Sequence, residues 1–190
     1  MNQDKDIDNK PASETRRKLV RGGLSAGPIL VTLTSRPVLA TTCYSPSETL
    51  SGAVSHKGTS MPTCTGHSVT TWRSAANTSW PASPKHNTLF TAYFTGATFY
   101  YDHANNRYMK MKEVLHLGSG SDPDEIGAYF ITALLNIQSG LVDSRALDAP
   151  GLQAMWHEFI TTAKYVPFGG ATPWTAADIK LYFTSTGIVG

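Results

Sequence analysis

The sequence is short of charged side chains. Charged residues make up 16% of the 190 residues, with 16 Lys and Arg against 14 Asp and Glu. Seven of the cations lie at or before Arg36, so the region from Thr41 onward has nine cations against ten acidic residues, a net charge of −1. A region so close to neutral lacks the cationic face that holds nucleic-acid phosphates. We therefore expect no nucleic-acid partner.

Long apolar runs and common catalytic motifs are also missing. The apolar stretch 22–33 contains three glycines, a proline and a serine, whereas a membrane-spanning helix needs about 20 consecutive apolar residues. From Thr41 onward the chain has no Gly-rich phosphate loop, no G-x-S-x-G nucleophile elbow and no H-E-x-x-H zinc motif. The sequence therefore predicts no permanent membrane span and gives no positive sign of an enzyme.

A cluster of cations precedes the weakly apolar stretch. Residues 15–21 read TRRKLVR, and the small residues at 38–40 end in Ala40. The cluster resembles the twin-arginine export signal, whose pattern is Ser/Thr-Arg-Arg-x-Phe/Leu-Leu/Val-Lys/Arg, with Arg16 and Arg17 as its arginine pair. A basic helix that rests on a membrane is the alternative, which Gly22, Gly23 and Pro28 disfavour because they break helices.

This resemblance implies the twin-arginine export machinery as a partner, cleavage after Ala40 and a periplasmic or secreted location. We therefore divide the chain into an export signal, residues 1–40, and a mature domain, residues 41–190. Because the machinery moves folded proteins, the resemblance also implies that the mature domain folds before export.

Cys43 and Cys64 are the only cysteines. In an oxidising compartment the simplest use of two cysteines is a disulfide, and closing a loop of about 22 residues stabilises a fold by about 3 kcal/mol on the chain-entropy model. The alternative is a metal site drawn from Cys64, His67, His56 and His103. A structural zinc site needs four ligands, and a second close ligand pair is missing. We expect the disulfide, and no cofactor.

The mature region predicts a mainly α, single-domain fold. Residues 41–84 are rich in Ser, Thr, Pro and Gly and predict a loop-rich segment tied by the disulfide. Residues 85–190 carry helical patterns and predict the helical core. We expect helices over 111–117, over about 123–138 with Asp122 as its N-cap, from Asp148 onward, and from Thr175 to Gly187. The second of these is apolar around most of its circumference and should be the central, buried helix.

Several polar and aromatic side chains invite a binding role. Trp72, Trp80, Tyr100 and Tyr101 are candidate stacking platforms for a sugar, although core packing is the ordinary use of aromatic residues at helical spacing. Asn136 lies within the expected central helix, where we expect its amide to bond the backbone of a neighbouring loop.

With these residues placed, the chain resembles a loosely defined group of uncharacterised exported bacterial proteins. The group shares a cysteine followed by a Pro-Gly-Tyr-Trp-Lys-type segment, a Trp-Pro pair, and TLF, LLEVLxLGG and ALLNAxSG segments. The counterparts here are Cys64, residues 72–73, 80–81, 88–90, 112–118 and 133–136. Residues 69–71 depart from the Pro-Gly-Tyr element. The resemblance implies export and a shared architecture, and no activity.

Three functions remain open at this point. We expect a non-enzymatic structural or interaction protein of the cell envelope or extracellular space. The alternatives are a small periplasmic metal-binding protein or enzyme, and a surface carbohydrate-binding module.

Overall fold

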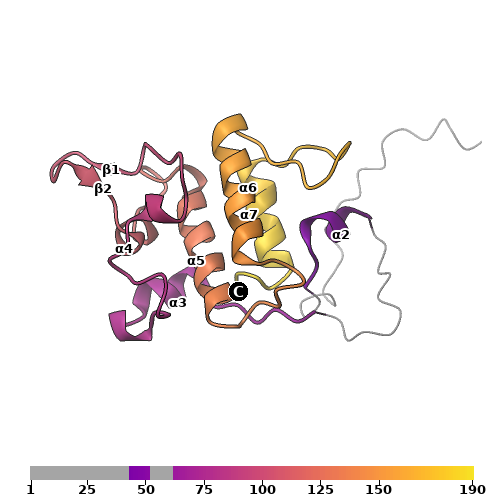
Figure 1. Cartoon of the computed structure of the whole chain (residues 1–190), viewed down its shortest axis with the longest axis horizontal. Coiled ribbons are helices and arrows are strands. Elements are labelled where there is room, and N and C mark those ends of the chain that lie inside the picture. Colours follow the sequence, from indigo (N-terminus) through magenta and orange to yellow (C-terminus); the bar gives the residue numbers. More distant parts are fainter. Residues whose placement is uncertain (1–42, 52–61) are drawn as a thin grey trace, which may run out of the picture. The chain divides into compact units, whose positions relative to one another are not determined.

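The computed structural model describes residues 43–51 and 62–190, all within the compact unit Pro37–Gly190 (Figure 1). Arg16, Arg17, Ala40 and His56, which the sequence singled out, lie outside the described residues. The helices are α2 (Pro46–Ser51), α3 (Val69–Ser74), α4 (Met111–Leu115), α5 (Ile126–Gln138), α6 (Ala149–Thr162) and α7 (Ala176–Ser185). The described residues contain one hairpin, in which β1 (Tyr101–Asp102) pairs antiparallel with β2 (Arg107–Tyr108). The predicted mainly α class is confirmed for this part of the chain.

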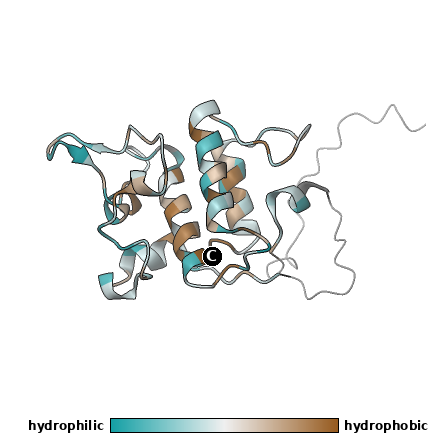
Figure 2. Ribbon diagram, in the orientation of Figure 1, coloured by the Kyte–Doolittle hydropathy of each residue, from teal (hydrophilic) through white to brown (hydrophobic). Residues whose placement is uncertain are grey.

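Helix α5 is the centre of the fold. Helices α6 and α7 pack on one side of it and α3 and α4 on the other (Figure 1). Ten of its 13 residues are buried, and its ribbon is among the most hydrophobic parts of the molecule (Figure 2). A helix that is apolar on most faces is stable only when neighbours cover it on most faces. The prediction of a central, buried helix is therefore confirmed.

An aromatic cluster fills the space between α5, α6 and the segment before the hairpin. The ring of Trp156 lies 5.0 Å from that of Phe130, 5.3 Å from Phe90 and 5.4 Å from Phe94, in edge-to-face orientations. Its indole N–H donates to the carbonyl of Thr95 at 3.0 Å. All four rings are fully buried, so this stripe of aromatic side chains forms core, as their helical spacing predicts.

The start of α5 differs from the sequence prediction. Residues Pro123–Glu125 form a separate 3₁₀ turn, and Asp124 and Glu125 have φ values of 59° and 53°. The α-helix therefore begins three residues later than expected, at Ile126. Asp122 still caps it, because its carboxylate accepts the backbone N–H groups of Gly127 and Ala128 at 3.1 Å each. The predicted capping carboxylate is present, but the N-cap residue of α5 is Glu125 rather than Asp122, and the predicted boundary was wrong.

Two other predicted caps are present. Asp148 Oδ1 accepts the N–H of Gly151 at 2.8 Å at the start of α6. At the start of α7, Thr175 Oγ1 accepts the N–H of Asp178, whose carboxylate in turn accepts the N–H of Thr175 at 2.8 Å. These reciprocal bonds satisfy backbone donors that have no partner inside the helix.

The loop-rich segment is anchored at its two cysteines. Cys43 and Cys64 form a disulfide, as predicted. Thr65 N–H donates to the carbonyl of Leu141 at 2.9 Å, and the hydroxyl of Tyr182 in α7 donates to the carbonyl of Tyr44 at 2.8 Å.

Among residues 43–51 and 62–190, no helix combines the length and the apolar character needed to cross a membrane.

Candidate functional site

A hollow of about 410 Å³, open to solvent, lies beside α4, and we call it the α4 hollow. It is lined by two segments, the turn before η2 (Phe90–Ala92) and helix α4 with its flanks. The lining residues are His86, Asn87, Lys110, Lys112, Glu113 and His116. Convergent polar side chains in a concavity are the ordinary mark of a binding site.

The carboxylate in this lining, Glu113, is already neutralised. Arg107 of β2 donates to its two oxygens at 2.6 and 2.8 Å, and the backbone N–H of Lys110 donates to Oε2 at 2.7 Å. The hydrogen bonds from Arg107 contribute most to lowering the pKa of Glu113 from 4.5 to about 2. A carboxylate held in this way stays charged and is a poor general base.

The two lysines give the α4 hollow its positive charge. Lys112 Nζ donates to the side-chain oxygen of Asn77 at 2.6 Å. Lys110 Nζ makes no hydrogen bond or ion pair with any described residue, and the same is true of the side-chain polar atoms of His86 and Asn87. Arg107 is shared between Glu113 and Asp102, and the charge of Lys110 also helps to lower the pKa of Glu113, so the cations and carboxylates of this cluster largely offset one another.

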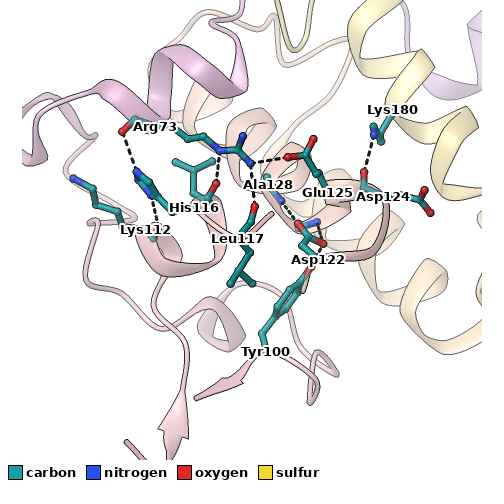
Figure 3. A network of polar contacts seen from close by, with 12 residues as sticks. Arg73, Tyr100, Lys112, His116, Leu117, Asp122, Asp124, Glu125, Ala128 and Lys180 are labelled. Atoms are coloured by element: carbon teal, nitrogen blue, oxygen red, sulfur yellow. Dashed lines mark hydrogen bonds and ion pairs between the residues drawn. The ribbon is translucent and has the colours of Figure 1, made fainter. Parts of the chain in front are cut away.

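His116 connects the α4 hollow to α3. One ring nitrogen, Nδ1, lies 2.7 Å from the carbonyl of Lys112, and the other, Nε2, lies 3.1 Å from the carbonyl of Arg73 (Figure 3). The ring thereby links the end of α4 to the end of α3.

Arg73 fixes the relative positions of α3, α4 and α5. Its guanidinium donates to the carbonyls of Leu115 at 2.7 Å and Leu117 at 3.2 Å, and pairs with Glu125 at 3.0 Å (Figure 3). The two carbonyls are the free acceptors at the end of α4, where a cation is favourable. On the α7 side, Lys180 donates to the carbonyl of Asp124 at 2.7 Å. These bonds hold the left-handed residues 124–125 from both sides.

A buried polar pair, Tyr100 and Asp122, lies next to this network. The hydroxyl of Tyr100 donates to Asp122 Oδ1 at 2.6 Å, and both residues are fully buried (Figure 3). Burial and the adjacent Asp122 carboxylate raise the pKa of Tyr100 far above its usual range. The position of Gly127 brings its backbone against this hydroxyl, where a Cβ would overlap it. The pair is structural, because solvent does not reach it.

The structure does not bring the predicted stacking residues to the surface. Trp72 is 4% exposed, Trp80 is 7% exposed and Tyr100 is fully buried. A sugar stacks on an exposed ring face, so these three side chains are not stacking platforms. Tyr101 is half-buried and packs edge-to-face against Tyr108 at 5.3 Å. The exposed aromatic side chains in this region are instead Phe99 and Tyr108.

The candidate metal ligands do not converge in the described part of the chain. The sulfur of Cys64 is bonded to Cys43. His67 is exposed and packs its ring against Trp72, and His103 lies in the β1–β2 turn against Tyr101. Residues 43–51 and 62–190 contain no group of three or more His, Cys, Asp or Glu side chains placed to hold a metal ion.

The α4 hollow was not predicted from the sequence. Its two segments, residues 86–87 and 110–116, lie more than twenty positions apart and carry no spacing that marks a site. The structure brings the two segments together through the antiparallel bridge between Leu89 and Lys110. That pairing could be anticipated only after residues 88–94 were known to turn rather than to continue as a strand or helix.

Comparison of the chain with protein-family models, curated proteins and solved structures found no match. The similarity to exported bacterial proteins and to twin-arginine signals stays a prediction from the sequence. A proposal for the function therefore draws on two structural features, the α4 hollow and the disulfide.

Proposed function

We propose that this chain is an exported, non-enzymatic structural or interaction protein that acts in the periplasm or outside the cell. The observation that carries the proposal is the Cys43–Cys64 disulfide, which closes the segment directly after the twin-arginine-type leader. Disulfides persist in oxidising compartments and are rare in the cytosol. The bond and the leader thus favour the same location.

The groups that line the α4 hollow suit ligand binding. Its carboxylate is neutralised by Arg107, and its remaining groups are amines, imidazoles and an amide. Such groups recognise a ligand by charge and hydrogen bonds. The aromatic side chains Trp72, Trp80 and Tyr100 stabilise the core and supply no ligand surface.

Export is tested by expressing the full chain in a bacterium that has the twin-arginine machinery. The wild-type protein should appear outside the cytoplasm, begin at Thr41 by mass spectrometry and contain no free thiol. The double variant Arg16→Lys/Arg17→Lys should stay in the cytoplasm with its leader attached, because the signal depends on the arginine pair.

The matched control is Lys5→Arg/Lys10→Arg, which makes two conservative changes of cations outside the arginine pair and should be exported normally. Equal export of both double variants would show that the arginine pair is not the signal. Wild-type protein that stays in the cytosol with residues 1–40 attached would overturn the proposed location.

A further inference from the structure

The apolar core of this protein is built almost entirely from residues 62–190, which we call the body. Within the described part of the chain, Cys43 is the one buried hydrophobic residue that precedes the body, since all the others lie at or after Cys64. Burial of apolar surface is the dominant favourable term in folding. The body therefore contains the packing interactions that it needs to fold.

Cys64 is held in the body by bonds that do not involve its sulfur. It forms an antiparallel bridge with Val142, and the N–H of the next residue, Thr65, donates to the carbonyl of Leu141 at 2.9 Å. These backbone bonds form equally well when the sulfur is a thiol. The position of Cys64 is thus set by the body and does not depend on the disulfide.

Residues 43–51, which we call the N-terminal segment, are joined to the body at their first two positions. Cys43 N–H donates to the carbonyl of Pro62 at 3.2 Å, and the carbonyl of Tyr44 accepts from the hydroxyl of Tyr182 at 2.8 Å. Among residues 43–49, Cys43 is buried and the others are partly or fully exposed. The helix of this segment, α2, has six residues, and a helix so short is not stable by itself in water. The disulfide is therefore the strongest link between the N-terminal segment and the body.

We propose that the Cys43–Cys64 disulfide is a redox switch that docks the N-terminal segment onto a body that is already folded. With both cysteines reduced, the body keeps its fold and the segment detaches. On oxidation the two thiols form one disulfide, and their two electrons and two protons convert the disulfide of an oxidant, such as a thiol–disulfide exchange protein, into two thiols. This inference rests on the proposed function, because export takes the chain from a reducing to an oxidising compartment.

The switch suits a protein that folds before export. In the proposed route the body folds in the cytosol, where disulfides rarely persist, so its fold must form without the bond. Detachment of the N-terminal segment also lengthens the chain between the leader and the first residue fixed to the body, and a longer linker has a longer reach. After export, oxidation fixes the segment in place.

The test measures amide hydrogen exchange of the full chain by mass spectrometry. Three forms are compared: the oxidised protein, the protein reduced with dithiothreitol, and Cys43→Ser/Cys64→Ser. Peptides from the N-terminal segment should exchange at least about tenfold faster in the last two forms, whereas peptides from α5 should change by less than about twofold. Oxidised glutathione should restore slow exchange in the reduced wild type and have no effect on the variant.

Tyr182→Phe is the matched control, since it removes the hydrogen bond to the carbonyl of Tyr44 and leaves the disulfide intact. Its N-terminal segment should exchange within about twofold of the oxidised wild type. A segment that stays protected without the disulfide, or that is released equally by Tyr182→Phe, would overturn the switch. Loss of protection in α5 together with the segment would show that the body does not fold without the bond, and would overturn it as well. None of these results depends on the arginine pair, so this test and the export assay fail separately.

Discussion

The side-chain amide of Asn136 and the indole of Trp72 meet inside the core, with Oδ1 and Nε1 2.8 Å apart. The same Oδ1 accepts the N–H of His67 at 3.0 Å, and Nδ2 donates to the carbonyls of His67 at 2.9 Å and Ile188 at 2.8 Å. One buried amide on α5 thus joins the segment before α3 to the C-terminal segment. The expectation that Asn136 bonds a neighbouring loop backbone is confirmed.

Asn136→Ala should lower the free energy of unfolding by about 3 kcal/mol or more, because it leaves several buried donors and acceptors without partners. Urea denaturation followed by tryptophan fluorescence measures the loss. Asn77→Ala removes an exposed amide whose oxygen accepts a hydrogen bond from Lys112, and should cost under about 1 kcal/mol. Equal losses in the two variants would show that the buried amide is not a structural hub.

Gly66→Ala should also destabilise the fold, by about 1–3 kcal/mol. A Cβ at this position would meet the carbonyl of Ile188 and the amide of Asn136, at distances that force the backbone apart. Gly118→Ala is the matched control, because no atom lies within 4 Å of its added Cβ. Thermal denaturation of the two variants distinguishes steric overlap from the general effect of replacing glycine, and a Gly66→Ala protein as stable as Gly118→Ala contradicts the close approach.

Thr132→Val should leave stability unchanged or raise it by about 1 kcal/mol. The hydroxyl of Thr132 is buried in α5 and has no hydrogen-bond partner among the described residues. The same change at Thr186, which is also buried, should destabilise, because that hydroxyl donates to the carbonyl of Tyr182 at 2.7 Å. Chemical denaturation should show a lower free energy of unfolding for Thr186→Val and no loss for Thr132→Val. Equal losses in the two variants would be inconsistent with an unpaired hydroxyl at residue 132.

The contribution of Glu113 to stability should depend on pH. Its folded-state pKa is lowered to about 2, chiefly by the hydrogen bonds from Arg107, so the unfolded chain takes up the proton first as the pH falls. The stabilisation is complete above pH 4.5 and is lost between about pH 4.5 and 2. Glu113→Gln should therefore cost about 1 kcal/mol at pH 7, given how much of the pair faces solvent.

Urea unfolding of wild type and Glu113→Gln at pH 7, 4 and 3 measures this dependence. The difference between the two proteins should shrink as the pH falls. A difference that stays constant down to pH 3 would mean that the charge of Glu113, as opposed to its shape, contributes nothing.

The sequence alone determined the local features of this protein. The caps at Asp148 and Thr175, the apolar circumference of α5 and the pairing of Cys43 with Cys64 were all predicted and are present. The caps and the helical pattern depend on residues that are close together in the sequence. The disulfide follows because the chain has only two cysteines. Capping bonds and helical periodicity involve residues only a few positions apart, so the sequence pattern shows them directly.

Only the tertiary structure decided which side chains reach solvent. Trp72, Trp80 and Tyr100 were candidates for a surface role and are buried, whereas Lys110 was not singled out and lines the α4 hollow. The left-handed residues at 124–125, held by Arg73 and Lys180, likewise moved the start of α5. Burial and strain of this kind arise from contacts between distant segments, and no pattern along the chain records them.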